Sequence, residues 1–266
     1  MPVHDDLGVQ LSNVQKNILY GAMLGDGCLS IHKNGKNAQF CYLSKSEQHV
    51  NYISNFFEDY ISNEGVKTNT YFDKRTRKEY NRTYFKTFAN PIFTCEYQKW
   101  YRAGKKHIPN NLSLNPAICL VWYIGDGGIC HLKRTECIKL ATQCFSKEEQ
   151  EDILLPQLND FEAKIMKTDV SLNGIQQYFI YIPHRKMDNF LKYIGECPFE
   201  DYQYKWNVSD YKYKKPSNHT MHETEFCDLY KKGFTYYAIA KQFNIEPNAV
   251  KYYLKKNGLY KQKEKY

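Results

Sequence analysis

The sequence lacks the patterns that mark membrane-spanning, secreted and zinc-finger proteins. No apolar run is long enough to cross a bilayer, and the first residues, MPVHDDLGVQ, do not have the basic and then apolar order of a signal peptide. The nine cysteines form no Cys-x-x-Cys pair and no zinc-ligand spacing. We therefore expect a soluble, intracellular protein with reduced thiols and no membrane partner. An organelle, a bacterium and a phage-infected cell are all compatible with this pattern.

The composition is that of a folded, basic protein. Hydrophobic residues make up 42% of the 266 residues, which is enough for a globular core. The formal net charge is +8, the chain contains 24 Tyr and 15 Phe, and Tyr is frequent beside Lys and Arg, as in EYNRTYFKTF at 79–88. Such surfaces suit nucleic acid, because basic groups neutralise phosphate and tyrosine adds flat contact area. A merely basic soluble protein has the same composition, so both interpretations stay open.

The most informative feature is an internal repeat. NILYGAMLGDGCLS at 17–30 is echoed by AICLVWYIGDGGIC at 117–130, and both apolar, helix-like runs end in Gly-Asp-Gly. Further along, SKSEQ at 44–48 matches SKEEQ at 146–150, each with a serine that can cap a helix and acids in the first turn. Two copies of one structural unit are therefore expected in the first two hundred residues.

The order of elements after these motifs is also repeated. Alternation of polar with apolar residues predicts strands in both halves, and each pair of strands is followed by a helical segment, the first of which starts at a proline. The strands are expected at 67–72, 82–88, 164–172 and 177–182, and the helices from residue 91 and over 184–194. The sequence thus predicts an α+β fold of two pseudo-symmetric halves, each with an antiparallel sheet.

The last sixty residues follow a different pattern. Residues 207–222 are polar and contain a proline, which is typical of a linker. Beyond them we expect three short helices, the second capped by Thr235 and the third over 248–256, which resemble a helix-turn-helix module. Lysines in the last helix and tail favour DNA binding by this module. A helical cap on the main domain is the alternative. The lysines are Lys251, Lys255, Lys256, Lys261, Lys263 and Lys265.

Asp26 and Asp126 are the candidate functional carboxylates. Each follows a strongly apolar helix, the first of which is expected to begin at Ser12 or Asn13 and to run through Leu24, with Gly27 as its C-terminal glycine. A carboxylate at that end faces the negative pole of the helix dipole, at a cost on the order of tenths of a kcal/mol. One such residue is compatible with a simple Asp-Gly turn, but two in equivalent places call for a cation.

Small residues predict that the two motif helices touch. Gly21 and Gly25 are four positions apart and so lie on one face, where a second helix can approach closely. Packing there would bring Asp26 and Asp126 together, and two adjacent carboxylates repel each other unless they are protonated or bridged by metal. Oxygen ligands favour Mg²⁺, and metal held by paired carboxylates suits phosphodiester hydrolysis.

These motifs resemble a known family. LYGAMLGDG at 19–27 and CLVWYIGDG at 119–127 look like the two LAGLIDADG motifs of homing endonucleases, and the resemblance extends over residues 12–206. KKHIPNNL at 105–112 looks like the linker between halves, and IKLATQCFS at 138–146 looks like the strand that follows the second motif. Two departures stand out. Val121 occupies the position of Gly21, and Gly125 replaces the acidic residue often found before the second catalytic Asp.

The resemblance implies roles for individual residues. Asp26 and Asp126 would be the metal-binding acids, and the carbonyls of Gly25 and Gly125 would add ligands. Basic residues of the two active sites would correspond to Lys106 and Lys205, which would polarise the phosphate or orient water, although plain phosphate contact is an alternative for both. A polar residue that helps to position water would correspond to Gln143.

The family further implies a double-strand DNA endonuclease. Its saddle-shaped sheets would lie in the major groove of a long site, with one Mg²⁺-dependent active site for each strand and Mn²⁺ able to substitute. Because both motifs are in one chain, a monomer is expected. Strand side chains that can read bases or touch phosphate are Lys67, Asn69, Lys74, Arg75, Arg77, Asn81, Arg82, Lys133, Arg134, Lys139, Asn173 and Gln176, with Lys251 and Lys255 in the C-terminal module.

Two other functions are compatible with this sequence. The protein could be a maturase that binds its host intron RNA, or a DNA-binding regulator on an inactive nuclease fold. The intact pair of Asp26 and Asp126 argues against the regulator but is compatible with a dual role.

The expected domains are two LAGLIDADG halves, a linker and a helix-turn-helix-like module, with boundaries at 1–104, 105–206, 207–222 and 223–266.

Overall fold

A computed structural model of the chain describes residues 10–61, 63–74, 76–132, 135–168, 174, 176–208 and 222–260. These residues fall into two compact units, one up to residue 208 and one from residue 222, and each is described by itself. Within these ranges, every helix is too short or too polar to span a bilayer.

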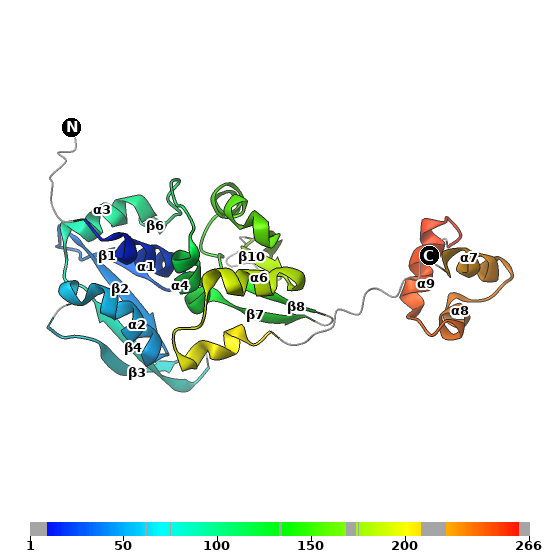
Figure 1. Cartoon of the computed structure of the whole chain (residues 1–266), viewed down its shortest axis with the longest axis horizontal. Coiled ribbons are helices and arrows are strands. Elements are labelled where there is room, and N and C mark those ends of the chain that lie inside the picture. The colour runs from blue at the N-terminus through cyan, green and yellow to red at the C-terminus, as the bar shows by residue number, and fades with distance from the viewer. Residues whose placement is uncertain are drawn as a thin grey trace. The chain divides into compact units, whose positions relative to one another are not determined.

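The first unit contains the predicted repeat (Figure 1). Its first copy consists of α1 (Asn13–Leu24), β1 (Cys28–Ile31), β2 (Ala38–Ser44), α2 (Glu47–Ser54), η1 (Asn55–Tyr60), β3 (Lys67–Asp73), β4 (Lys78–Lys86) and α3 (Pro91–Trp100). A small hairpin of β5 (Tyr101–Arg102) and β6 (Lys105–Lys106) follows. The second copy consists of α4 (Pro116–Asp126), β7 (Gly127–Leu132), β8 (Thr135–Leu140), α5 (Lys147–Glu149), η2 (Gln150–Leu154), η3 (Pro156–Phe161), β9 (Lys164–Lys167), β10 (Tyr178–Pro183), α6 (His184–Ile194) and η4 (Glu200–Trp206).

The two sheets have the same topology. Strand order is β1-β2-β4-β3 in the first sheet and β7-β8-β10-β9 in the second, and all pairings are antiparallel. The expected serine caps are also present at equivalent places, since Ser46 and Ser146 each accept a hydrogen bond from the backbone of the helix that they precede. The predicted α+β class and the repeated order of elements are confirmed.

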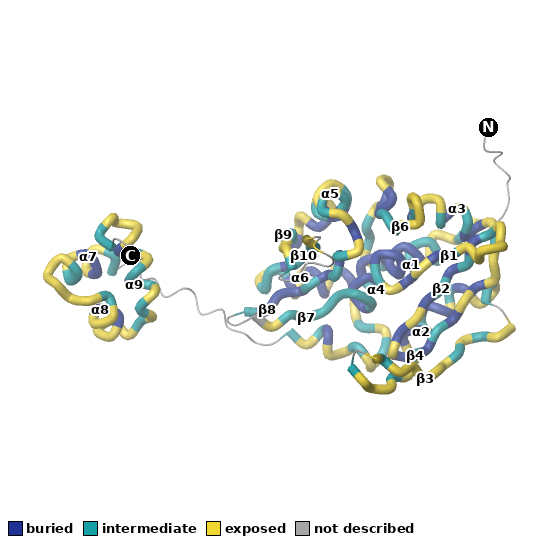
Figure 2. Tube along the Cα trace, turned by 180° about the vertical axis from the view of Figure 1, so that it is seen from behind, coloured by how far each residue is buried: buried dark blue, intermediate teal, exposed yellow. Residues whose placement is uncertain are grey.

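The motif helices α1 and α4 pack directly against each other in the middle of the unit (Figure 1). Gly21 is the point of closest approach: a Cβ atom added there would lie 2.6 Å from the Ile118 carbonyl and 2.7 Å from the Val121 Cβ. The Val121 side chain therefore fills the space that the missing side chain of Gly21 leaves. The two motifs differ at this position because the larger residue of one helix packs against the glycine of the other. Figure 2 shows the contacting parts of both helices mostly in the dark blue of buried residues.

One face of each sheet supplies the core. In the first sheet, Phe40 packs against Phe85 and Phe57 with ring centroids 5.6 and 5.1 Å apart, and against Phe93 of α3. In the second sheet, Ile138 and Ile180 are fully buried. Alternation along the strands turns the neighbouring residues to the other face. The outer strand β3 is exposed along most of its length (Figure 2).

Three element ends differ from the sequence predictions. Helix α1 runs to Leu24 as predicted, but its C-cap is Gly25, and Gly27 instead allows close approach, since a Cβ there would meet the Ala22 carbonyl at 2.8 Å. The strand predicted for 138–146 ends at Leu140, because its ladder partner begins only at Gly127, after the end of α4. Strand β4 starts earlier, at Lys78, since it pairs with β3 down to the hairpin tip. Strand β9 covers 164–167, and 169–172 lie outside the described residues.

The second unit is a three-helix module with its own core. It consists of α7 (Glu223–Lys231), α8 (Tyr236–Gln242) and α9 (Pro247–Lys256), and Thr235 caps α8 as predicted. Its fully buried side chains come from all three helices: Phe226, Ile239, Val250 and Leu254. Of the predicted linker, residues 209–221 lie outside the described part of the chain.

Substitution of Gly21 tests the helix contact. In an ordinary helix Gly→Ala stabilises by about 1 kcal/mol. Here we expect Gly21→Ala to lower the free energy of unfolding by about 2–3 kcal/mol, since overpacking forces two buried backbones apart. The matched control is Gly128→Ala in β7, where an added Cβ meets nothing within 4 Å and a change below about 0.5 kcal/mol is expected. Urea unfolding of both variants gives the comparison, and equal stabilities would contradict this packing.

Candidate active site

The contact between α1 and α4 brings the two motif carboxylates together. Asp26 follows the end of α1, and Asp126 is the last residue of α4. A Cβ atom on Gly25 would lie 3.6 Å from the Asp126 Cβ, and one on Gly125 would lie 3.9 Å from Asp26 Oδ2. Asp26 is exposed and Asp126 is half-buried. The two carboxylates therefore form one site that is open to a substrate.

The environment of this pair disfavours its negative charge. Withdrawal of water and, after it, the charge of Asp26 together raise the pKa of Asp126 to about 6, against the opposite effect of Lys106 and Lys205. The pKa of Asp26 is also raised, again through loss of surrounding water and against the effect of both lysines. Without a bound cation, the site thus holds its two charges unfavourably close.

Lys106 lies at the C-terminal end of α1. It follows the tight turn of the small hairpin, where Ala103 and Gly104 have φ of 48° and 74°. Its Nζ donates to the carbonyls of Gly25 and Gly27 at 3.0 and 2.8 Å, so that the ammonium caps the negative end of the helix. Burial lowers the pKa of Lys106, and both carboxylates counteract this effect. The Gly25 carbonyl, expected as a metal ligand, thus accepts a hydrogen bond from Lys106.

Lys205 has the corresponding position at the end of α4. It comes from η4, is 7% exposed, and donates from Nζ to the Ile124 carbonyl at 2.5 Å and to the Tyr123 carbonyl at 3.5 Å. The Tyr123 hydroxyl in turn donates to the Lys205 carbonyl at 2.5 Å. Burial lowers the pKa of Lys205 to about 8. Each motif helix therefore ends at one lysine, Lys205 buried and Lys106 half-buried, and both lysines act on the carboxylate pair.

Sequence reasoning missed a buried polar cluster beside this site. Tyr42 points its hydroxyl towards the pair, 3.5 Å from where a Gly125 Cβ would lie, and shares a hydrogen bond of 3.0 Å with His49 Nε2. Burial lowers the pKa of His49 to about 3, so the imidazole is neutral. Tyr202 packs on His49 and lies under the Lys205 ammonium at 4.6 Å. These residues come from separate segments, and no spacing in the sequence connects them.

The role of Gln143 in positioning water stays a prediction. The residue lies in the turn after β8, where its backbone carbonyl accepts a hydrogen bond from the Gln177 side chain at 3.3 Å. Cys144, the next residue, interacts electrostatically with Asp126 and Lys106. Strand β8 has ended before this turn, and Gln150 hydrogen-bonds both the carbonyl and the side chain of the neighbouring Thr142.

The donor set fits a hard divalent cation. Among the described residues, no group of three or more His, Cys, Asp and Glu side chains is arranged to hold a metal. Two carboxylates that repel each other, with backbone carbonyls beside them, are a partial oxygen shell. Mg²⁺ is commonly bound in this way, through one or two carboxylates with water and substrate phosphate completing its ligands. Asp26 and Asp126 could therefore hold such an ion.

The outer face of the first sheet carries several of the predicted DNA-binding residues. Lys67, Asn69 and Arg82 lie on this face, where Arg82 donates to the Asn69 side chain at 2.8 Å and stacks 4.9 Å over Tyr71. Lys86 shares the face but was not predicted. Asn81 is on the opposite side of β4, because side chains alternate along a strand. Lys74 and Arg77 are exposed at the hairpin tip.

In the second sheet, Lys139 lies on the outer face in a row with Tyr181 and Lys164. Lys139 was predicted to contact DNA, whereas Tyr181 and Lys164 were not. Its ammonium lies 4.4 Å over the Phe179 ring. Gln176 precedes β10, and its side chain donates to backbone carbonyls of Thr168 and Gln177. Four predicted residues lie outside the described part of the chain: Arg75, Lys133, Arg134 and Asn173. Both outer faces thus present cations.

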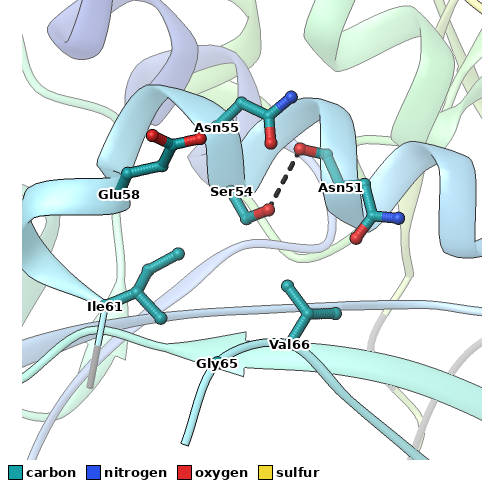
Figure 3. Close-up of a pocket in the computed structure, with 7 residues that line it drawn as sticks. All are labelled: Asn51, Ser54, Asn55, Glu58, Ile61, Gly65 and Val66. Atoms are coloured by element: carbon teal, nitrogen blue, oxygen red, sulfur yellow. Dashed lines mark hydrogen bonds between the residues drawn. The ribbon is translucent and has the colours of Figure 1, made fainter. Parts of the chain in front are cut away.

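A surface pocket elsewhere in the unit is unrelated to this site (Figure 3). Within it, the Ser54 hydroxyl donates to the Asn51 carbonyl at 3.0 Å. The charged residue of its lining, Glu58, repels phosphate. The residues that line it are Asn51, Ser54, Asn55, Glu58, Ile61, Gly65 and Val66.

The raised pKa of Asp126 leads to a stability prediction. The pKa of Asp126 is about 6 in the folded protein and 3.8 ordinarily, so protonation of this carboxyl stabilises the folded state. This stabilisation is fully present below pH 3.8 and is lost as the pH rises through 6. Asp126→Asn should therefore raise the free energy of unfolding at pH 8 in EDTA by on the order of 1–2 kcal/mol, allowing for solvent screening, with little effect near pH 4.

Thermal unfolding in EDTA at both pH values measures this difference. The control is Asp59→Asn, since Asp59 is exposed on η1 away from the pair. A variant that is less stable than the parent at pH 8 would contradict the electrostatic account. Mg²⁺ should stabilise the parent protein and leave Asp126→Asn nearly unchanged.

Comparisons with known proteins agree with this geometry. The DNA endonuclease I-ChuI of Chlamydomonas applanata is 28% identical over 220 residues, which cover 76% of this chain and 97% of that protein. The cytochrome b mRNA maturase bI2 of Debaryomyces hansenii is 26% identical over 195 residues, or 71% of each chain. In fold, the chain is similar to the homing endonuclease I-WcaI bound to its DNA recognition sequence, with a TM-score of 0.64 and 21% identity over 79% of this chain and 96% of that one.

The LAGLIDADG DNA endonuclease family matches residues 16–190. This range is more than half of the chain and contains both motif helices, both carboxylates and both sheets. The chain belongs to the LAGLIDADG DNA endonuclease family.

Proposed function

We propose that the chain binds a long site in double-stranded DNA and hydrolyses one phosphodiester bond in each strand. The observation that carries this proposal is the pairing of Asp26 with Asp126 between Lys106 and Lys205, at the crossing of the motif helices. Membership of a DNA endonuclease family supports the same conclusion. The side chains on the outer sheet faces of this chain would determine which DNA sequence it binds.

Each group of the site has a task in this reaction. Asp26 and Asp126 would hold divalent metal, Mg²⁺ in the cell with Mn²⁺ able to substitute, assisted by backbone carbonyls such as that of Gly125. When bound there, such an ion activates water and stabilises the leaving oxygen. Lys106 and Lys205, held at the helix ends, present ammonium groups to the phosphate and stabilise the charge that develops on it.

DNA binding is the task of the two sheets. Their outer faces would form a saddle on the duplex, with residues 1–104 over one half of the site and 105–206 over the other. Arg82 and Asn69 would read bases, and Lys67, Lys86 and Lys139 would contact phosphate, since all five lie on the outer sheet faces. Since one chain contains both motifs, a monomer would cut both strands.

The first experiment tests cleavage on a natural substrate. The two DNA segments that flank the gene are rejoined without it, and the resulting duplex is incubated with the protein in Mg²⁺ or in EDTA. We expect a double-strand cut that requires the metal. Asp26→Asn and Asp126→Asn should each lower the cleavage rate by at least about 10²–10³-fold, the range found when one charge-stabilising group is lost.

The Asp59→Asn variant serves as control and should cut like the parent. Tight binding without a cut by the parent protein would overturn the endonuclease proposal. Because a free-standing gene can target other DNA, a negative result on this duplex is followed by a cleavage screen on a pool of random duplexes, and failure there would also reject the proposal.

The lysines give a prediction about the two strands. Lys106 contacts the end of α1 and Lys205 contacts the end of α4, so each serves a different half of the site. Lys106→Met and Lys205→Met should each slow one strand by about 10²-fold, so that nicked DNA accumulates, with the nick on opposite strands. Lys105→Met, in the same hairpin but exposed, is the control and should not accumulate nicks. Equal slowing of both strands by both variants would contradict the assignment.

A second candidate function is assistance to intron splicing. Its support is the similarity to a cytochrome b mRNA maturase, which covers 71% of this chain. The intact carboxylate pair is compatible with both activities and speaks against a regulator that only binds DNA. Splicing of the host intron RNA with and without the protein separates the two, and splicing that Asp26→Asn leaves unaffected would assign a maturase role that is independent of cleavage.

A further inference from the structure

The helix α9 in the second unit presents a polar stripe that its own core does not use. Asn248, Lys251, Tyr252 and Lys255 are spaced by three and four residues and so lie on one face. The other face packs inwards through Val250 and Leu254, which are fully buried. Asn248, Tyr252 and Lys255 are exposed, and Lys251 is half-buried. Three of the four stripe residues, Asn248, Tyr252 and Lys255, are therefore exposed on a rigid helix surface outside the core of this unit.

Charge is segregated within the unit. α9 contains no acidic residue, whereas α7 contains Glu223, Glu225 and Asp228. Lys256, at the end of α9, is held by an ion pair of 3.0 Å with Glu223 of α7. The stripe lysines thus retain a positive surface that complements a polyanion.

An aromatic side chain lies in the middle of this positive face. Tyr252 is 63% exposed, between Lys251 and Lys255 along the stripe. Lys251 is itself positioned, because its ammonium lies 5.7 Å over the Tyr236 ring and 5.0 Å over the Tyr260 ring. An exposed ring flanked by cations and an amide suits contact with base edges and phosphates together.

The connection to α8 sets the geometry of this helix. Residues 243–246 form the turn between α8 and α9, and Asn244 takes the left-handed conformation with φ of 51°, which asparagine tolerates better than most residues. The Ile245 amide donates to the Ala240 carbonyl at 2.9 Å, which closes the turn. This is a helix, a turn and a second helix with one free face, the arrangement that inserts a helix into the DNA major groove.

We propose that α9 binds the major groove of double-stranded DNA and adds a recognition contact to that of the cleavage unit. Asn248 and Tyr252 would contact base edges, and Lys255 would contact phosphate. Duplex RNA fits less well, since its major groove is too narrow for a helix. The inference extends the proposed function, because both units would read one target, but its test measures binding, so cleavage and α9 binding can fail separately.

The test compares the full chain with a chain that ends at residue 208, both in EDTA. A pool of 40-base-pair duplexes with a random core serves as the probe, and the bound sequences are read after selection. The full chain should select an additional block of specified bases that the shorter chain does not, and should bind a selected duplex at least about tenfold more tightly. Because the module has its own buried core, residues 222–266 alone should also bind that block.

Point variants locate the contact within the full chain. Asn248→Ala and Tyr252→Ala should each weaken binding to the selected duplex about tenfold and relax preference in the extra block, while Lys255→Ala should lower the salt slope by roughly 1. Matched controls are Tyr237→Ala, whose ring is 62% exposed on α8, and Lys232→Ala, exposed after α7. Equal losses in the controls would overturn the assignment to α9. Identical motifs from both chain lengths, or tighter binding to an RNA of the same sequence, would overturn DNA recognition by this module.

Discussion

The close contact between α1 and α4 at Gly21 is the constraint on which the rest of the first unit depends. Two helices whose backbones approach this closely cross at one point, and the residues that end them must lie near each other. Asp26 and Asp126 are those residues. The sheets follow directly from the same helices, since β1 and β7 start within a few residues of the carboxylates. One packing contact therefore sets the distance between the acids and the placement of both DNA-facing surfaces.

The convergence has an electrostatic cost that the fold compensates only in part. Two carboxylates meet at the negative ends of two helix dipoles, and the surrounding protein withdraws water from them. Lys106 and Lys205 offset this, but each is engaged with carbonyls of a helix end. The remaining imbalance is what a divalent cation and a phosphate would correct together. A site of this kind is less stable alone than when occupied, as is usual where function opposes stability.

Much of this arrangement was predictable from the sequence, because it depends on patterns of neighbouring residues. The repeat of Gly-Asp-Gly after apolar helices predicted the two halves, and alternation in the strands predicted the sheets. Ends of elements were less predictable. Strand β8 stops at Leu140, since pairing depends on where its partner begins, so Gln143 lies in a turn beyond the strand. Tyr42 and His49 carry no local signal of their role, because their hydrogen bond and their place beside Gly125 exist only after folding.

The sequence by itself determined the class of fold, the repeat, the pairing of the two motif carboxylates and the existence of a separate helical module. Each of these depends on periodicity or on a motif within a few turns of chain. The tertiary structure decided which lysine contacts which helix, that Val121 complements Gly21, and that Asn81 lies on the other side of β4 from Arg82. The physical reason is that these features depend on distances between segments far apart in the chain, which packing and strand register set and which no local pattern encodes.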